Sequence, residues 1–156
     1  MDPRSTQGKA ALVRKEEERT DLIDMTGVCA WLTGFTGLPV DEGTIARFLT
    51  LGFGSDVGTE ALKTAATRMH HLERCFLGMC GLTRRDDTVS RAHFGRVKPG
   101  GNEMPEINCT LEELELMKDD YYRLMGWDRE TGMPTRQTLE KFDLLDIVDP
   151  RSHIHP

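Results

Sequence analysis

Apolar and polar residues alternate along this chain with helical spacing in several stretches. The clearest apolar stripe runs from Glu60 to Leu77, where apolar side chains recur every three or four residues. No stretch shows the sustained two-residue alternation between turn signals that is typical of strands. We therefore expect an all-α fold, an irregular helical domain with long loops, whose helices cover residues 9–23, 30–35, 45–53, 60–77, 110–125 and 135–142.

Short polar residues mark the expected helix ends. Thr110 and Glu113 have the spacing of a capping box, in which each side chain bonds the backbone N–H of the other residue. We expect Thr59 and Thr135 to cap the helices that follow them, and Gly126 to end the helix that begins at Thr110.

The first helix has a thin apolar face, formed by Leu12, Val13, Leu22 and Ile23. We expect its buried partner to lie elsewhere, in a domain that the chain lacks. The domain organisation predicted from the pattern is a disordered tail over residues 1–8, one helical domain over 9–146 and a tail over 147–156. Residues 81–109 are polar and are expected to form a long surface loop.

The length and net charge of the chain argue against several classes of protein. A chain of 156 residues is enough for one domain with a real core. The net charge is −6, from 20 basic and 26 acidic residues, and no basic stripe is present, so we expect no nucleic-acid partner. No run of residues approaches membrane-spanning length, and no leader is visible. With four cysteines (Cys29, Cys75, Cys80, Cys109), reduced thiols in the cytoplasm are the simplest expectation.

The stretch from Asp24 to Cys29 places a carboxylate, a glycine and a thiol within six residues. A carboxylate accepts hydrogen bonds from a heterocycle, and a thiolate ligates a soft metal or an iron–sulfur cluster. Gly27 allows a turn with positive φ or a close approach to a ligand. An equally simple interpretation is structural: Gly27 ends a helix, Asp24 is solvated and Cys29 is a small buried side chain.

Asp24-x-x-Gly27-Val28-Cys29 resembles the D-x-x-G-L-C motif of the tungsten-containing aldehyde:ferredoxin oxidoreductase family. The resemblance continues in two further blocks, from about Gln7 to Leu145 in all. Leu72-Glu73-Arg74-x-Phe76 with the segment 81–88 is similar to the family's "ERxFN-x-REG-x-TRKDD" sequence, and 121–141 is similar to its closing "YYxxRGWDxxGxPT" sequence. Such enzymes are several times longer, so the resemblance implies the C-terminal part of one, as a fragment or as a split subunit.

The resemblance also implies cofactors and partners. The family binds a tungsten (or molybdenum) bis-pterin beside a [4Fe–4S] cluster, and it oxidises aldehydes to carboxylic acids with ferredoxin as electron acceptor. By the same resemblance, Asp24 would hydrogen-bond the pterin, Gly27 and Val28 would bring backbone to it, and Cys29 would ligate the cluster. The expected partners are the N-terminal domains or subunit of the enzyme, ferredoxin and a small aldehyde.

A complete cluster takes four cysteines, and the family's C-x2-C-x3-C stretch is absent from this sequence. We therefore expect the chain to be inactive alone. One alternative is a non-catalytic interaction module or a degenerate remnant, favoured by Leu77–Cys80 in place of the family's Asn-x-Arg-Glu. A second is a zinc site through His71, Cys75 and Cys80. The segment 83–87 is either a turn of paired charges or part of a wall near a cofactor.

Overall fold

A computed structural model describes residues 5–31, 40–90 and 109–148. Within these segments the chain forms helices and no strand; two loop residues, Trp127 and Pro134, make an isolated bridge. The all-α expectation is confirmed. The helices are α1 (Lys9–Thr26), α3 (Glu42–Phe53), α4 (Thr59–Met79), α5 (Leu111–Met125) and α6 (Arg136–Lys141). Residues 32–35 of the helix expected at 30–35, residues 1–4 and 149–156 of the expected tails, and residues 91–108 of the loop lie outside the described residues.

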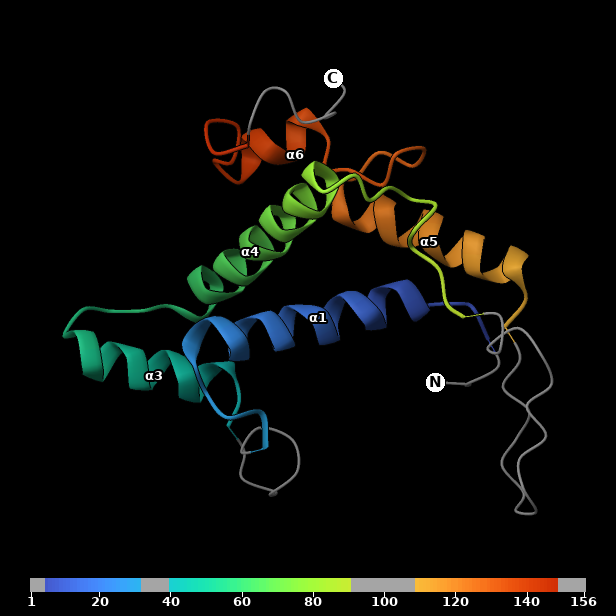
Figure 1. Ribbon diagram of the computed structural model, residues 1–156. Helices are drawn as coiled ribbons and strands as arrows, with labels where there is room; N and C mark the ends of the chain where they lie inside the picture. Colours follow the sequence, from blue (N-terminus) through green and yellow to red (C-terminus); the bar gives the residue numbers. More distant parts are fainter. Residues whose placement is uncertain (1–4, 32–39, 91–108, 149–156) are drawn as a thin grey trace, which may run out of the picture.

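Three of the helices form the sides of a triangle (Figure 1). Helix α1 packs against both α4 and α5, whose C-terminal ends meet at the opposite corner beside α6. Helix α3 packs against α4. Leu22 and Ile23 of the thin apolar face of α1 are buried within this chain, whereas Leu12 and Val13 are 40% and 46% exposed. Part of that face therefore has its partners in this chain.

Apolar side chains gather in three clusters, one at each of two corners and one against α6. The first joins the end of α1 to α3 and the start of α4. The second joins the end of α4 to α6 and the residues after it, and the third closes the C-terminal end of α5. Their buried members are Leu22, Ile45, Ala46, Leu62 and Ala66; Cys75, Leu139, Leu144 and Val148; and Tyr122, Met125 and Trp127.

Val148 belongs to the second cluster with 5% of its surface exposed. The packed part of the chain therefore continues past residue 146, where we had placed the end of the domain.

Most of the helix ends that were predicted from the sequence are found at the predicted positions. Thr110 and Glu113 form both bonds of the capping box, and Gly126 ends α5 with φ 68°. The Thr135 side chain accepts a bond from the Thr138 N–H. The expectation for Thr59 is wrong: Gly58 occupies the N-cap position in extended conformation, and Thr59 is already the first helical residue.

The apolar stripe expected from Glu60 to Leu77 is only partly buried. On α4, Leu62, Ala66 and Cys75 are buried, but Phe76 is 62% exposed. On α5 the buried residues are Tyr122 and Met125. Among the described helices, none combines the length and the apolar character needed to cross a membrane.

Candidate functional site

The Asp24–Cys29 stretch lies where α1 ends. Gly27 adopts the left-handed conformation, with φ 70°, and its N–H donates to the Asp24 carbonyl at 3.3 Å. An added Cβ at Gly27 would meet no atom within 4 Å, so the conformation and not crowding favours glycine here. Gly27 thus ends a helix, as the structural interpretation held, and it also leaves open space beside the turn.

The polar groups of this turn face outward. Asp24 and Cys29 are both exposed, and the Cys29 thiol is free. Val28 instead packs against the first apolar cluster, which anchors the turn to the body of the protein. Cys29 is therefore not the buried side chain of the structural interpretation. The arrangement offers one accessible carboxylate and one accessible thiol beside an open glycine.

Asp24, Gly27 and Cys29 are placed so that they could contact one edge of the implied pterin and cluster. They do not by themselves make a complete binding site. A [4Fe–4S] cluster takes four thiolates. In the described part of the chain, no group of three potential metal ligands includes Cys29. Cys75 is buried among apolar residues, and burial raises the pKa of its thiol to about 11. The remaining thiolates would have to come from another polypeptide segment.

A cavity of about 430 Å³ opens between α1, α4 and α5, away from this turn. Leu114, Met117 and Tyr121, which the helical spacing of α5 puts on one face, line it. Polar groups reach it from all three helices and from the loop after α4. They are Lys9, Glu17, His70, Glu73, Arg74, Asp87, Lys118, Tyr121 and Tyr122.

A buried arginine holds one corner of this cavity together. Arg74, 6% exposed, donates to both carboxylate oxygens of Asp87 at 2.8 and 2.6 Å and to the Gly132 carbonyl at 2.7 Å. Its guanidinium also lies over the Trp127 ring, 5.2 Å from the centroid. The Tyr122 hydroxyl donates to the same Asp87 carboxylate. The bidentate, charge-assisted pair fixes the loop after α4 to α4 itself, and the Tyr122 bond ties the same loop to α5.

The segment 83–87 forms the turn of paired charges that was one of its two interpretations. Arg84 donates to Glu115 and Asp119 of α5, each at 2.5 Å. Asp87 at the end of the segment lines the cavity between α1, α4 and α5.

A second polar network links α1 to α4 and α5. The Tyr121 hydroxyl donates to Glu17 at 2.5 Å and lies 2.9 Å from Nε2 of His70. The His70 ring stacks on Trp127 with centroids 5.8 Å apart. Burial and the neighbouring Glu17 raise the pKa of Tyr121, so its proton stays on the phenol.

His71 has a structural role in the fold. It is 1% exposed, and its Nδ1 accepts a 2.9 Å hydrogen bond from the Trp127 indole. Burial, with neighbouring His70, Arg14 and Lys141, lowers the pKa of His71 to about 4. With His71 bonded to Trp127 and Cys75 in an apolar cluster, the packing disfavours the zinc set of His71, Cys75 and Cys80.

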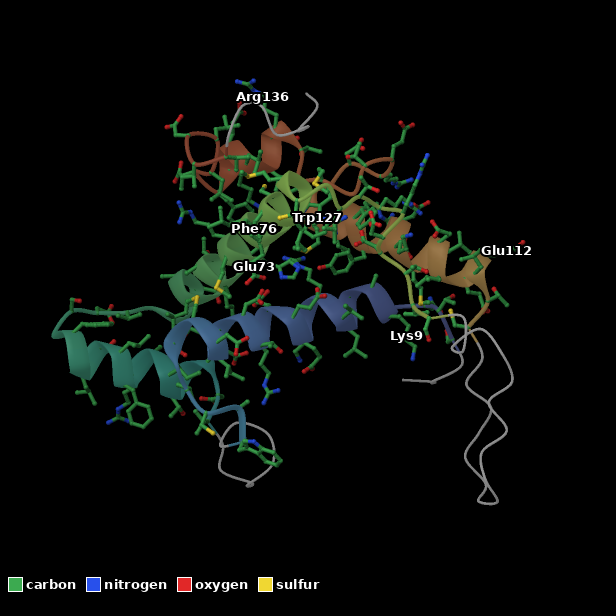
Figure 2. All side chains as sticks on the ribbon, in the orientation of Figure 1. Lys9, Glu73, Phe76, Glu112, Trp127 and Arg136 are labelled. Atoms are coloured by element: carbon green, nitrogen blue, oxygen red, sulfur yellow. The ribbon has the colours of Figure 1, made fainter. Side chains whose placement is uncertain are left out.

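Sequence reasoning missed a different group of potential ligands. Single atoms of Asp21, His70 and Glu73 lie within 4.8 Å of one another. Glu73 stands on the side of α4 that faces α1 (Figure 2). The three-residue spacing of His70 and Glu73 on one helix was visible in the sequence, but Asp21 joins them only through the packing of α1 on α4.

Comparison with known proteins identifies the family. The family model described as "Aldehyde ferredoxin oxidoreductase, domains 2 & 3" matches residues 1–144. A solved chain of the active-site complex BamBC of benzoyl coenzyme A reductase, in complex with 1,5-dienoyl-CoA, superposes with a TM-score of 0.76 and 28% identity. The match covers 93% of this chain and 20% of that one, so this chain spans about a fifth of its length. The chain belongs to the aldehyde ferredoxin oxidoreductase family.

Proposed function

We propose that this chain is the C-terminal portion of a tungsten or molybdenum bis-pterin, [4Fe–4S]-containing oxidoreductase, and that it needs the missing domains for activity. One observation carries the proposal: the family motif forms an exposed turn at the end of α1, with Asp24 and Cys29 both accessible. Family membership and coverage of about a fifth of a larger enzyme chain support it.

Each residue of the turn would have a distinct part in binding. Asp24 would accept hydrogen bonds from pterin N–H groups through its free carboxylate. The open space at Gly27 would let the backbone approach the cofactor, while Val28, packed against the body of the domain, would hold the turn in place. Cys29 would supply one thiolate to the cluster. When bound, the metal-pterin and cluster would supply the redox chemistry.

Two classes of substrate are proposed. The family name favours oxidation of an aldehyde to a carboxylic acid, with electrons passed to ferredoxin. The structural relative belongs to a benzoyl coenzyme A reductase, which favours reduction of a coenzyme A thioester by a related enzyme. The described part of the chain supplies no residue that distinguishes the two, so both substrates belong in the assay.

The test is co-expression, without oxygen, of this chain with a polypeptide that carries the family's C-x2-C-x3-C stretch. Iron, tungsten and cluster absorbance are measured for the purified complex, for Cys29→Ala and for Cys80→Ala. Cys80 is a matched control because it is also a free and exposed thiol. We expect cluster absorbance to be lost in Cys29→Ala and kept in Cys80→Ala.

Equal iron content in the complex and in Cys29→Ala would refute the role of Cys29. If neither sample held iron or tungsten although the complex formed, the chain would be an interaction module or a remnant of the family. Turnover of an aldehyde with a viologen dye by the isolated chain would contradict its dependence on the missing domains.

A further inference from the structure

The polar network between α1 and α4 contains two buried atoms that face each other. Oδ2 of Asp21 and Nδ1 of His70 are 3.0 Å apart, an ion pair when His70 is protonated, and neither atom has another hydrogen-bond partner. Asp21 is 8% exposed, so water does not replace the missing partner. Buried polar atoms are nearly always paired, and an exception therefore needs a physical explanation.

The hydrogen bonds around His70 indicate which of its ring nitrogens carries a proton. An ionised Glu17 only accepts hydrogen bonds, so the Tyr121 proton is used towards Glu17 and the Tyr121 oxygen accepts from Nε2–H of His70. In a neutral imidazole the other nitrogen, Nδ1, then carries a lone pair, and it points at a carboxylate oxygen. Two acceptors at this distance repel, so either a proton on Nδ1 or a metal cation must lie between them.

Negative charge accumulates around the same point. Glu73 supplies a third ligand atom within 4.8 Å, and Glu17 lies 3.7 Å from His70. Burial raises the pKa of Asp21; His70 opposes this rise, whereas Glu73 and Glu17 add to it. The Arg74 guanidinium donates to Asp87 and to the Gly132 carbonyl. Those bonds are not directed at the carboxylates of Asp21 and Glu73.

We propose that Asp21, His70 and Glu73 bind a divalent first-row transition ion that joins α1 to α4. One imidazole nitrogen and two carboxylates suit Mn²⁺, Fe²⁺ or Zn²⁺. The bond from Nε2–H of His70 to Tyr121 is the outer contact that fixes the tautomer and orientation of metal-binding histidines. The exposed Glu73 completes the set from the solvent side, through which the ion would enter.

The test uses the isolated chain and does not depend on the pterin or the cluster. Mn²⁺ is the first probe because thiols bind it poorly; its binding is followed by loss of the free-ion EPR signal, and Zn²⁺ is then added as a competitor. The decisive variant is Glu73→Gln, since Glu73 is exposed and its replacement leaves the packing intact. The matched control is Glu60→Gln, which removes an exposed carboxylate from the same helix.

We expect one site, weakened at least about tenfold in Glu73→Gln, since even outer-shell changes cost metal sites about that much. Asp21→Asn should weaken it further, and Glu60→Gln should not change it. Equal affinity of Glu73→Gln and Glu60→Gln would overturn the proposal. So would binding lost on replacing His153 and His155 instead, or no binding of either ion, in which case a proton lies between Asp21 and His70.

Discussion

The buried pair of His71 and Trp127 should make the stability of this domain depend on pH. His71 is neutral in the folded protein because burial lowers its pKa to about 4, whereas an unfolded histidine has a pKa near 6.5. Between these two values the unfolded chain binds a proton at residue 71 and the folded chain does not. Acid therefore favours unfolding, and this contribution to stability falls as the pH falls from about 6.5 towards 4.

The size of the effect follows from the two pKa values. One pKa unit corresponds to about 1.4 kcal/mol, and most of the interval is crossed by pH 5. Proton linkage at His71 should therefore lower the free energy of unfolding by about 2 kcal/mol between pH 7 and pH 5. The residue is 1% exposed, so solvent does not screen the effect.

The assay is urea denaturation of the wild type and of His71→Asn at pH 7 and at pH 5. Asparagine does not titrate in this range, and its side-chain oxygen still provides an acceptor for the Trp127 indole N–H. We expect the wild type to lose about 2 kcal/mol more than the variant over this interval. Equal losses would refute a neutral, buried His71, because all other titrating groups are common to both proteins.

Two further changes test the packing around the site. Thr110→Ala should lower the free energy of unfolding in urea by about 1 kcal/mol because it removes the capping box of α5. Thr59→Ala should lower it clearly less, because Gly58 holds the cap position of α4. Equal losses in the two variants would contradict the observed caps. Arg74→Met should cost about 2–3 kcal/mol because it leaves Asp87 without its bidentate partner, and a change below about 0.5 kcal/mol would show that the pair contributes little.

Local signals in the sequence predicted local structure well. The capping box at Thr110 and the glycine end at Gly126 depend on a few neighbouring residues, and the structure has both. The cap at Thr59 was misplaced by one position. A serine or threonine next to a glycine leaves both as possible caps, because glycine also tolerates the extended conformation there.

The remaining errors come from long-range packing. The face of α5 with Leu114 and Met117 looks like core by periodicity, but the divergence of α1, α4 and α5 turns it towards a cavity. The grouping of Asp21 with His70 depends on a helix crossing that no short window of sequence contains. Resemblance to the family identified the chain, since three ordered blocks are far more specific than periodicity.

The composition of α1 determines how firmly the motif turn is held. Its buried residues are Ala10, Asp21, Leu22 and Ile23, and its middle contacts its neighbours through Glu17 and Asp21. The Tyr121 hydroxyl needs the Glu17 carboxylate as its acceptor, whereas apolar burial needs no polar partner. The turn at Gly27 is thus anchored at one end by Leu22 and Val28, and further along the helix by the hydrogen bond from Tyr121 to Glu17. A substitution that removes the Glu17 carboxylate would therefore loosen the support behind Asp24 and Cys29 and leave the apolar anchor in place.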